Sequence, residues 1–362
     1  MRATRSAVES NPRVRSLGSQ DLAHVLEHTR DLWTGLRGAR VVVSGASGFV
    51  GSWLLETLVH ADATLDLGIE ATALVRDREE FMRRLPHIAA SSAVRLESVD
   101  LRLTDPPTRA FTHFVHCASA ASPRVNSERP DDVVELIEVG TARMIEAAES
   151  LGGVRFLQVS SGSVYGPQDS TVARLDETHP AAADARDPAQ RFGAAKRQAE
   201  ERGEAAVSRG VGFVSARIFA LVGPRLPLDG PYAVGNFLGD ALAGRPVRLT
   251  GDGSPVRSWL HAADMAAWCW TLLARGAPGA AYNVGSEEAL TLWDAARRVA
   301  ALPSPPVQAV RAAAPDPATR PSRYVPSIRR ARDELGLEAW IPFEDALHRT
   351  WDWLRMENRT TA

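Results

Sequence analysis

Two features of the sequence have residue types and spacing that could do chemistry: a single lysine and a glycine-rich turn. Lys196 is the only lysine, whereas every other one of the 42 basic residues is an arginine. Such usage indicates that position 196 needs a compact ammonium or a tunable proton, which the planar guanidinium of arginine does not supply. The alternative is that one lysine stands there by chance.

The glycine-rich turn contains Gly45, Gly48 and Gly51 and directly follows an apolar run over 41–43. That run is continuous, which is typical of a strand buried on both faces of a parallel sheet. Apolar residues at helical spacing over 53–59 predict a helix after the turn. Backbone N–H groups at a helix start favour negative charge, so we expect a pyrophosphate there. The alternative is a tight loop without a ligand, because the spacing differs from the simplest dinucleotide fingerprint.

Further short apolar runs alternate with helical patterns along the first two thirds of the chain. These runs cover 71–75, 94–99, 114–116, 156–160 and 212–216. The alternation predicts an α/β fold with a doubly wound, Rossmann-type parallel sheet that binds ligands at the carboxyl ends of its strands.

We expect three parts along the chain. They are an N-terminal helical extension over 1–38, with an amphipathic helix over 21–36; a dinucleotide-binding domain over 39–220; and a smaller mixed substrate lobe over 221–362. Within the lobe, residues from about 262 to 290 are expected to return to the first domain. An amphipathic helix near 343–354 closes the chain.

Composition excludes several classes of partner. The net charge of −2 gives no indication of a nucleic acid or an anionic membrane. Cys117 and Cys269 have no metal-ligand spacing and fit a reducing compartment. The N-terminus lacks an apolar signal core, and the longest apolar stretch, over 265–274, is half a membrane span. We therefore expect a cytoplasmic protein without a metal.

Several short motifs appear in a fixed order. They are Gly45-x-x-Gly48-x-x-Gly51, Asp100, His116-Cys117-Ala118, the segment from Ser160 to Gly166, Lys196, Gly223-Pro224, Gly251-Asp252-Gly253 with Arg257, and the segment from Tyr282 to Gly285. Together they resemble the extended short-chain dehydrogenase/reductase superfamily, the nucleotide-sugar epimerases and dehydratases, over about 40–355. The resemblance implies an enzyme that modifies a nucleotide sugar by transient hydride transfer to bound NAD(P).

The resemblance also implies roles for individual residues. The cofactor-binding residues would be Gly45, Ser47, Gly48, Phe49, Val50, Gly51, Arg76, Asp77, Asp100, Leu101, Cys117, Ala118 and Lys196. The substrate-binding residues would be Ser119, Ser161, Ser163, Asn236, Arg257 and Arg323. Asp100 would hydrogen-bond the adenine, or else cap a turn. Arg257 would clamp the diphosphate, or else form a surface salt bridge. Ser161 would bind the sugar oxygen that is oxidised, or else satisfy local backbone.

The expected catalytic centre departs from the family pattern at one position. In the resembling enzymes, the lysine lowers the pKa of a tyrosine four residues earlier, and this chain has Phe192 there. Either tyrosine was replaced by engineering, or the departure is natural. In the natural case the oxidation step is lost, which leaves a redox-silent NAD(P)-binding protein, or another group such as Tyr165 or a nearby carboxylate serves it.

Three further expectations concern cofactor, reaction and assembly. Arg76 comes before Asp77 after the second strand, which favours NADP slightly, unless Asp77 takes the ribose of NAD. The resembling dehydratases carry an Asp-Glu pair where this chain has Gly162 and Ser163, and the related decarboxylases keep the glutamate. Epimerisation is therefore the first choice, and dehydration and decarboxylation are the alternatives. Helix 133–148 and the helix after Phe192 would pair in a homodimer, unless the sheet already covers their apolar faces.

Overall fold

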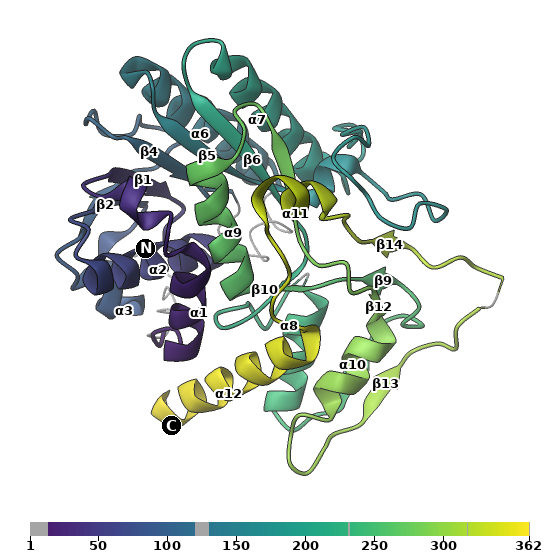
Figure 1. Cartoon of the computed structure of the whole chain (residues 1–362). Coiled ribbons are helices and arrows are strands. Elements are labelled where there is room, and N and C mark those ends of the chain that lie inside the picture. The colour runs from purple at the N-terminus through teal and green to yellow at the C-terminus, as the bar shows by residue number, and fades with distance from the viewer. Residues whose placement is uncertain (1–13, 120–129, 231, 317, 362) are drawn as a thin grey trace, which may run out of the picture.

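The computed structural model of the chain describes residues 14–119, 130–230, 232–316 and 318–361. Its centre is a parallel sheet with the strand order β11-β6-β5-β4-β1-β2-β3 (Figure 1). These strands are β1 (Arg40–Ser44), β2 (Glu70–Val75), β3 (Val94–Ser98), β4 (His113–His116), β5 (Arg155–Ser161), β6 (Gly212–Ile218) and β11 (Ala281–Val284). The chain changes direction across the sheet at β1, which pairs with both β2 and β4. The predicted doubly wound, Rossmann-type sheet is therefore confirmed.

Helices cover both faces of the sheet, which explains its continuous apolar strands. Val42 points to the side of α6 (Pro130–Leu151) and α7 (Arg191–Val207), where it joins a cluster with Phe114 and Phe156. Val41 and Val43 point to the opposite side and belong to the larger core, with side chains of α2 (Phe49–Leu65) and α9 (Ala262–Arg275). All three valines are at most 1% exposed.

A second, smaller region follows β6. Its elements are β7 (Leu221–Val222), α8 (Ala233–Leu242), β8 (Val247–Leu249), β9 (Val256–Arg257), β10 (Leu260–His261), β12 (Leu290–Thr291), α10 (Leu292–Ala300), β13 (Ala309–Arg311), β14 (Arg323–Tyr324), α11 (Arg329–Leu335) and α12 (Phe343–Thr361). Short sheets, β12-β9-β14 and β13-β8, organise it away from the main sheet (Figure 1). Between these elements, α9 packs on β5 and β6, and β11 adds the edge strand beside β6.

The helix expected over 21–36 is divided in two. The α-helix α1 (Ser19–Thr29) ends first, and a 3-10 helix, η1 (Trp33–Leu36), follows. The Thr29 hydroxyl bonds to the carbonyl of Val25 and accepts a hydrogen bond from the indole of Trp33 at 2.9 Å. Local side-chain bonds of this kind compete with helix continuation, so the apolar spacing was read correctly but the element boundary was not.

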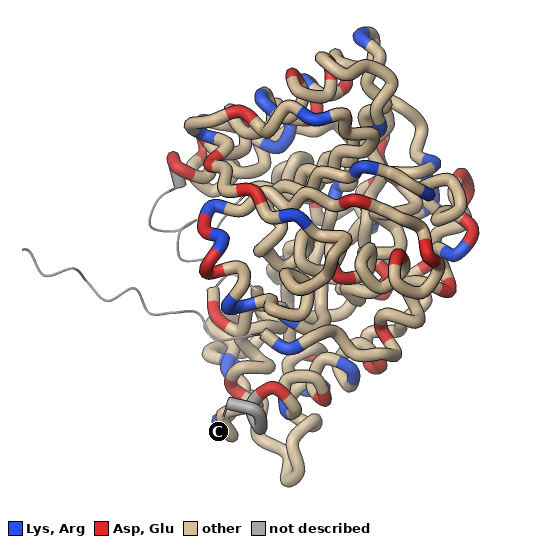
Figure 2. The backbone as a smooth tube through the Cα atoms, turned by 90° about the vertical axis from the view of Figure 1, so that its left-hand side faces the viewer, with Lys and Arg blue, Asp and Glu red and all other residues tan. Residues whose placement is uncertain are grey.

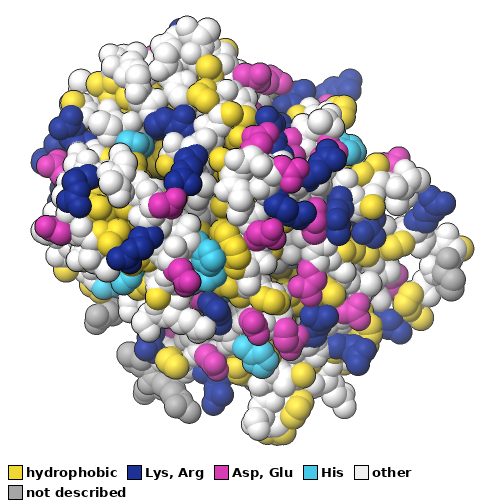
Figure 3. All heavy atoms as spheres, in the orientation of Figure 1, with side chains coloured by type: hydrophobic (Ala, Val, Ile, Leu, Met, Phe, Trp, Pro, Cys, Tyr) yellow, Lys and Arg dark blue, Asp and Glu magenta, His cyan; other side chains and the backbone are white. Residues whose placement is uncertain are grey.

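The surface is mixed in charge. Basic and acidic residues are interspersed along the chain in Figure 2, and the face in Figure 3 shows both signs side by side. Across the described ranges, no helix has the length and apolar character needed to span a bilayer.

Candidate active site

The glycine-rich turn forms a cradle that only small residues can line. Gly45 has φ of +66°, and a Cβ atom there would lie 2.7 Å from the backbone nitrogen of Ala118. A Cβ atom on Gly51 would lie 2.2 Å from the carbonyl oxygen of Gly45. Gly48 caps α2, so the first N–H groups of that helix face the turn. The cradle therefore fits a pyrophosphate approaching close to the backbone.

A groove runs from this cradle along the carboxyl ends of β1, β2, β3 and β4. It is lined by Gly45, Ser47, Gly48, Leu74, Val75, Arg76, Asp77, Glu80, Phe81, Arg84, Val99, Asp100, Leu101, Cys117, Ala118, Ser119 and Leu136. Most of the predicted cofactor residues are thus brought together, and Ser119 lies with them. Phe49, Val50 and Gly51 start α2 behind the lining, and Lys196 lies outside it.

Sequence reasoning missed Arg84 in this groove. It ends α3 (Arg78–Arg84), and its guanidinium donates to the carbonyl of Ser47 at 3.3 Å. Nothing in the spacing after β2 distinguishes this arginine from its exposed neighbours. The fold alone brings it to the glycine turn.

The two acidic residues predicted in the groove have partners of their own. Asp77 caps α3 and accepts from the backbone N–H of Glu80 at 2.9 Å. Asp100 accepts two hydrogen bonds from the Arg102 guanidinium, at 2.7 and 3.1 Å, and one from the Arg102 backbone. These bonds hold the pKa of Asp100 below its usual value. The structure thus shows the turn-capping arrangement for Asp100, beside the groove that would hold an adenine.

Lys196 is buried on α7 at the end of β5. Its side chain is 2% exposed, and its ammonium donates to the carbonyl of Val159 at 2.8 Å. Burial lowers the pKa of Lys196 to about 8, opposed by the nearby Cys117 and Glu200. A lysine ammonium has three donors, so this one has capacity left for a ligand.

Phe192 lies one helical turn before Lys196, as the i,i+4 spacing requires. The ammonium is 5.9 Å from the centre of its ring. The ring packs beside an apolar cluster between α6 and α7 that includes Val133, Ile137 and Ala199. That this ring stands where the resembling enzymes have a tyrosine stays a prediction.

Three hydroxyl groups meet beside Gly162, and we call them the hydroxyl cluster: Ser161, Ser163 and Tyr324. The Ser161 hydroxyl caps the 3-10 helix η2 (Gly162–Tyr165) and donates to the Ser163 hydroxyl at 3.1 Å. The half-buried Tyr324 comes from β14 and brings its hydroxyl to Gly162, beside both serines. Burial raises the pKa of Tyr324, and the two serine hydroxyls partly offset that effect. Sequence reasoning missed Tyr324, which stands in a two-residue strand far from the other motifs.

Tyr165, predicted as one replacement for the missing catalytic hydroxyl, uses its hydroxyl in bonds within the protein, and its catalytic role stays a prediction. Its hydroxyl donates to Asn283 at 2.8 Å and accepts from Arg217 at 2.9 Å. Arg217 also makes a bidentate pair with Glu200, the nearest pair distance being 2.7 Å. We call Tyr165, Glu200, Arg217 and Asn283 the buried network. Burial raises the pKa of Tyr165 to about 12.

The predicted substrate residues of the second region are dispersed. Arg257, the register partner of Tyr324 on β9, donates to the carbonyls of Val256 and Ser322 at 2.8 and 3.3 Å. Over the described ranges it forms no salt bridge, which removes that alternative. Asn236 lies on α8 and donates to the carbonyl of Gly230 at 2.8 Å, away from the groove.

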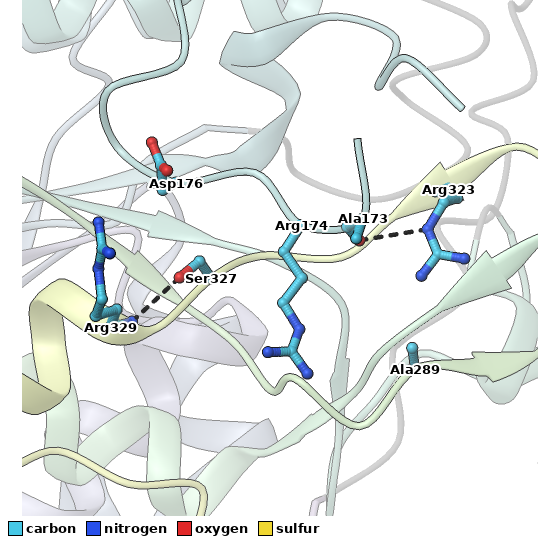
Figure 4. Close-up of a pocket in the computed structure, with 7 residues that line it drawn as sticks. All are labelled: Ala173, Arg174, Asp176, Ala289, Arg323, Ser327 and Arg329. Carbon is cyan, nitrogen blue, oxygen red and sulfur yellow. Dashed lines mark hydrogen bonds between the residues drawn. The ribbon is translucent and has the colours of Figure 1, made fainter. Parts of the chain in front are cut away.

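Arg323 opens into a different cavity from Tyr324. Neighbouring residues of a strand point to opposite sides, so Tyr324 reaches Ser161 while Arg323 reaches the outside of β14. There it donates to the carbonyl of Ala173 at 3.3 Å and lines a cavity with Arg174 and Arg329 (Figure 4). In the part of the chain described, no cluster of His, Cys, Asp and Glu could hold a metal.

Comparison with known proteins gives consistent results. Residues 41–285 match the model of the family described as "NAD dependent epimerase/dehydratase family". UDP-glucuronic acid decarboxylase 1 of Arabidopsis thaliana is 27% identical over 321 residues, which cover 87% of this chain and 69% of that protein.

Two solved structures are similar in both sequence and fold. DesIV, a dTDP-glucose 4,6-dehydratase from Streptomyces venezuelae with NAD bound, is 26% identical with a TM-score of 0.72, covering 89% of this chain and 98% of that one. UDP-glucose 4-epimerase of Thermus thermophilus, in complex with NAD, is 27% identical with a TM-score of 0.69, covering 87% of this chain and 99% of that one.

Proposed function

Because this chain belongs to the NAD-dependent epimerase/dehydratase family, we propose that it epimerises a nucleotide-diphosphate sugar by transient hydride transfer to bound NAD(P). The observation that carries the proposal is the alignment of three parts along the carboxyl end of the sheet. The glycine cradle ends β1, Lys196 contacts the end of β5, and Ser161 is the last residue of β5. When bound, the cofactor would accept and return a hydride.

Residues of the chain would bind the cofactor and orient the substrate. Gly45 and Gly51 would admit the pyrophosphate, and Lys196 would hold the ribose hydroxyls of the nicotinamide half through its free donors. Ser161 would orient the sugar hydroxyl that is oxidised. Gly162 and Ser163 bring no carboxylate to this point, which supports epimerisation over water elimination, since elimination needs an acid and a base of its own.

Decarboxylation is the second candidate, because the decarboxylase from Arabidopsis thaliana aligns over most of this chain. Phe192 supports the third, a redox-silent NAD(P)-binding protein. Incubation of the protein with a panel of nucleotide sugars, followed by NMR, separates the three. A new sugar epimer supports the proposal, and release of carbon dioxide from a uronic acid supports decarboxylation.

The Phe192→Tyr variant is the matched control for the same panel. A chain with a disabled site should gain activity from the added hydroxyl. If neither protein converts any sugar, the proposed enzymatic function is contradicted, and cofactor retention by the inactive chain would favour the redox-silent alternative.

Arg76 supports a preference for NADP, because the carboxylate of Asp77 is already used to cap α3. The Arg76→Ala variant should therefore weaken binding of NADP far more than that of NAD, measured by calorimetry. Equal losses would contradict the preference.

A homodimer paired through α6 and α7 stays a prediction, as does a cytoplasmic location. Within one chain, Val133 and Ile137 already belong to a cluster with Ala195 and Ala199 of α7. An interface would have to use the outer faces of both helices. Light scattering that gives a monomer at micromolar concentration would contradict the dimer.

A further inference from the structure

The phenol of Tyr324 occupies the space that a side chain at position 162 would take. A Cβ atom built on Gly162 would lie 2.6 Å from the Tyr324 hydroxyl and 2.7 Å from the ring of Phe219. Real Cβ atoms do not approach other atoms so closely. The phenol of Tyr324 can therefore point inward only because residue 162 is a glycine. Position 162 directly follows Ser161, the residue expected to bind the reacting hydroxyl of the sugar.

Rigid elements hold this phenol in place. The Tyr324 and Phe219 rings lie 4.6 Å apart, and β14 pairs in register with β9. On either side of Tyr324, Arg323 bridges to Gln168, and the backbone N–H of Val325 donates to the Gln168 side chain at 3.0 Å. A side chain supported in this way can keep a productive geometry.

We propose that Tyr324 is the catalytic acid and base of this site and carries the proton that Phe192 cannot carry. The inference rests on the proposed function. The replacement comes from a different part of the chain, because Phe192 belongs to α7 whereas Tyr324 belongs to β14 of the second region.

The step is balanced with the cofactor as oxidant. The O–H bond of the sugar carbinol breaks and its proton passes to the Tyr324 oxygen in its phenolate form. The C–H bond breaks in the same step, and its electron pair leaves with the hydrogen as hydride to oxidised NAD(P). The carbinol carbon becomes a ketone, and the return of both groups restores the alcohol. Burial raises the pKa of the Tyr324 phenol, and the serine hydroxyls and the positive charge of Arg257 oppose this effect by favouring the phenolate.

The test compares Tyr324→Phe with three further proteins: wild type, Tyr232→Phe and the double variant Tyr324→Phe/Phe192→Tyr. Tyr232 is 44% exposed and serves as the control for loss of a phenol hydroxyl. Tyr324→Phe should lower kcat at least about 100-fold, the ordinary worth of a proton carrier, with the nucleotide-sugar Kd changed less than about threefold. Tyr232→Phe should leave kcat unchanged. The double variant should regain activity, because it restores a phenol to α7.

A second measurement does not depend on turnover. The chain has four tyrosines, so labelling of their ring carbons with ¹³C gives four NMR signals that single Tyr→Phe variants assign. Addition of a nucleotide sugar to the NAD(P)-loaded protein should shift the Tyr324 signal and leave that of Tyr165 in place.

The outcomes separate the two proposals. If Tyr324→Phe keeps kcat within about threefold of the wild type, this inference is overturned while the proposed function stands. The same holds if a nucleotide sugar binds and leaves the Tyr324 signal unmoved. A shifted Tyr324 signal without any turnover supports the contact and contradicts epimerisation. If no nucleotide sugar binds, the proposed function fails and the inference fails with it.

Discussion

The buried network and the hydroxyl cluster both include a residue of η2, Tyr165 and Ser163 respectively, and differ in their remaining hydrogen-bonding capacity. In the buried network, the Tyr165 hydroxyl both donates and accepts, and Arg217 is bonded to Glu200 and Tyr165. In the hydroxyl cluster, hydroxyls bond mainly to one another, and each keeps a lone pair or proton for a ligand. The partners of Tyr165 therefore suit it to a structural role. The partners of Tyr324 leave its hydroxyl able to bind a ligand.

Loss of Arg217 should break the buried network and give the largest effect. The Arg217→Met variant leaves the buried Glu200 without its charged partner, although the Ser160 hydroxyl still bonds to it, and breaking a buried ion pair costs about 3–5 kcal/mol of unfolding free energy. Urea denaturation measures the loss. The control is Arg245→Met, whose pair with Asp240 joins an arginine that is 63% exposed and should cost less than about 1 kcal/mol. Equal losses in the two variants would show that the network is not a stabilising unit.

Tyr165→Phe tests the contrast between the two tyrosines directly. A hydrogen bond to a charged group contributes about 1.5–3 kcal/mol, so removal of this hydroxyl should lower stability by that amount and leave the nucleotide-sugar Kd unchanged. Tyr324→Phe should instead leave stability almost intact and lower kcat, again with little change in the nucleotide-sugar Kd. If Tyr165→Phe abolishes turnover in a folded protein, the structural role assigned to Tyr165 is wrong.

Lys196→Arg tests the hydrogen-bonding capacity assigned to the buried ammonium. Charge is preserved, but the longer planar guanidinium cannot enter the same buried site, so the Kd for NAD(P) should rise about tenfold or more, which is about 1.4 kcal/mol. The control is the reverse exchange one residue later, Arg197→Lys, which should change the Kd little. An unchanged Kd in Lys196→Arg would mean that the single lysine is an accident of sequence.

The pH dependence of stability tests the burial of the Lys196 ammonium. The pKa of Lys196 is about 8 in the folded chain, below its ordinary value of 10.5, so the unfolded chain binds this proton more tightly. Stability contributed by this group therefore rises with pH from about 8 to about 10.5, by at most about 1.4 kcal/mol per pH unit. Subtraction of the same curve for Lys196→Met removes the titration of other groups. If the difference between the two stability curves does not change with pH, the Lys196 ammonium is exposed to solvent and the predicted effect of burial is contradicted.

The parts of the site that are contiguous in sequence could be predicted, and the parts that come from distant segments could not. Gly45 to Gly51 are one turn and the start of α2, directly after β1, so local spacing was enough to indicate the cradle. Lys196 was found through composition. Tyr165 was predicted as a catalytic candidate because it follows Ser161 closely in sequence. In the structure, η2 places its hydroxyl in the buried network. Tyr324 gave no signal, because its role comes from register with β9 and from the space at Gly162.

The first helix of the chain is held by the last third of it. Asp21 on α1 accepts from Arg349 on α12 at 3.1 Å, across 328 residues, and His24 lies 2.7 Å from Asp264 at the start of α9 (Figure 1). During synthesis, α1 leaves the ribosome long before either partner exists. Its apolar residues Val25 and Leu26 then lack most of their core. Completion of the fold at the N-terminus is therefore a late, post-translational event, and nascent chains stalled before α9 should present α1 to proteases and chaperones.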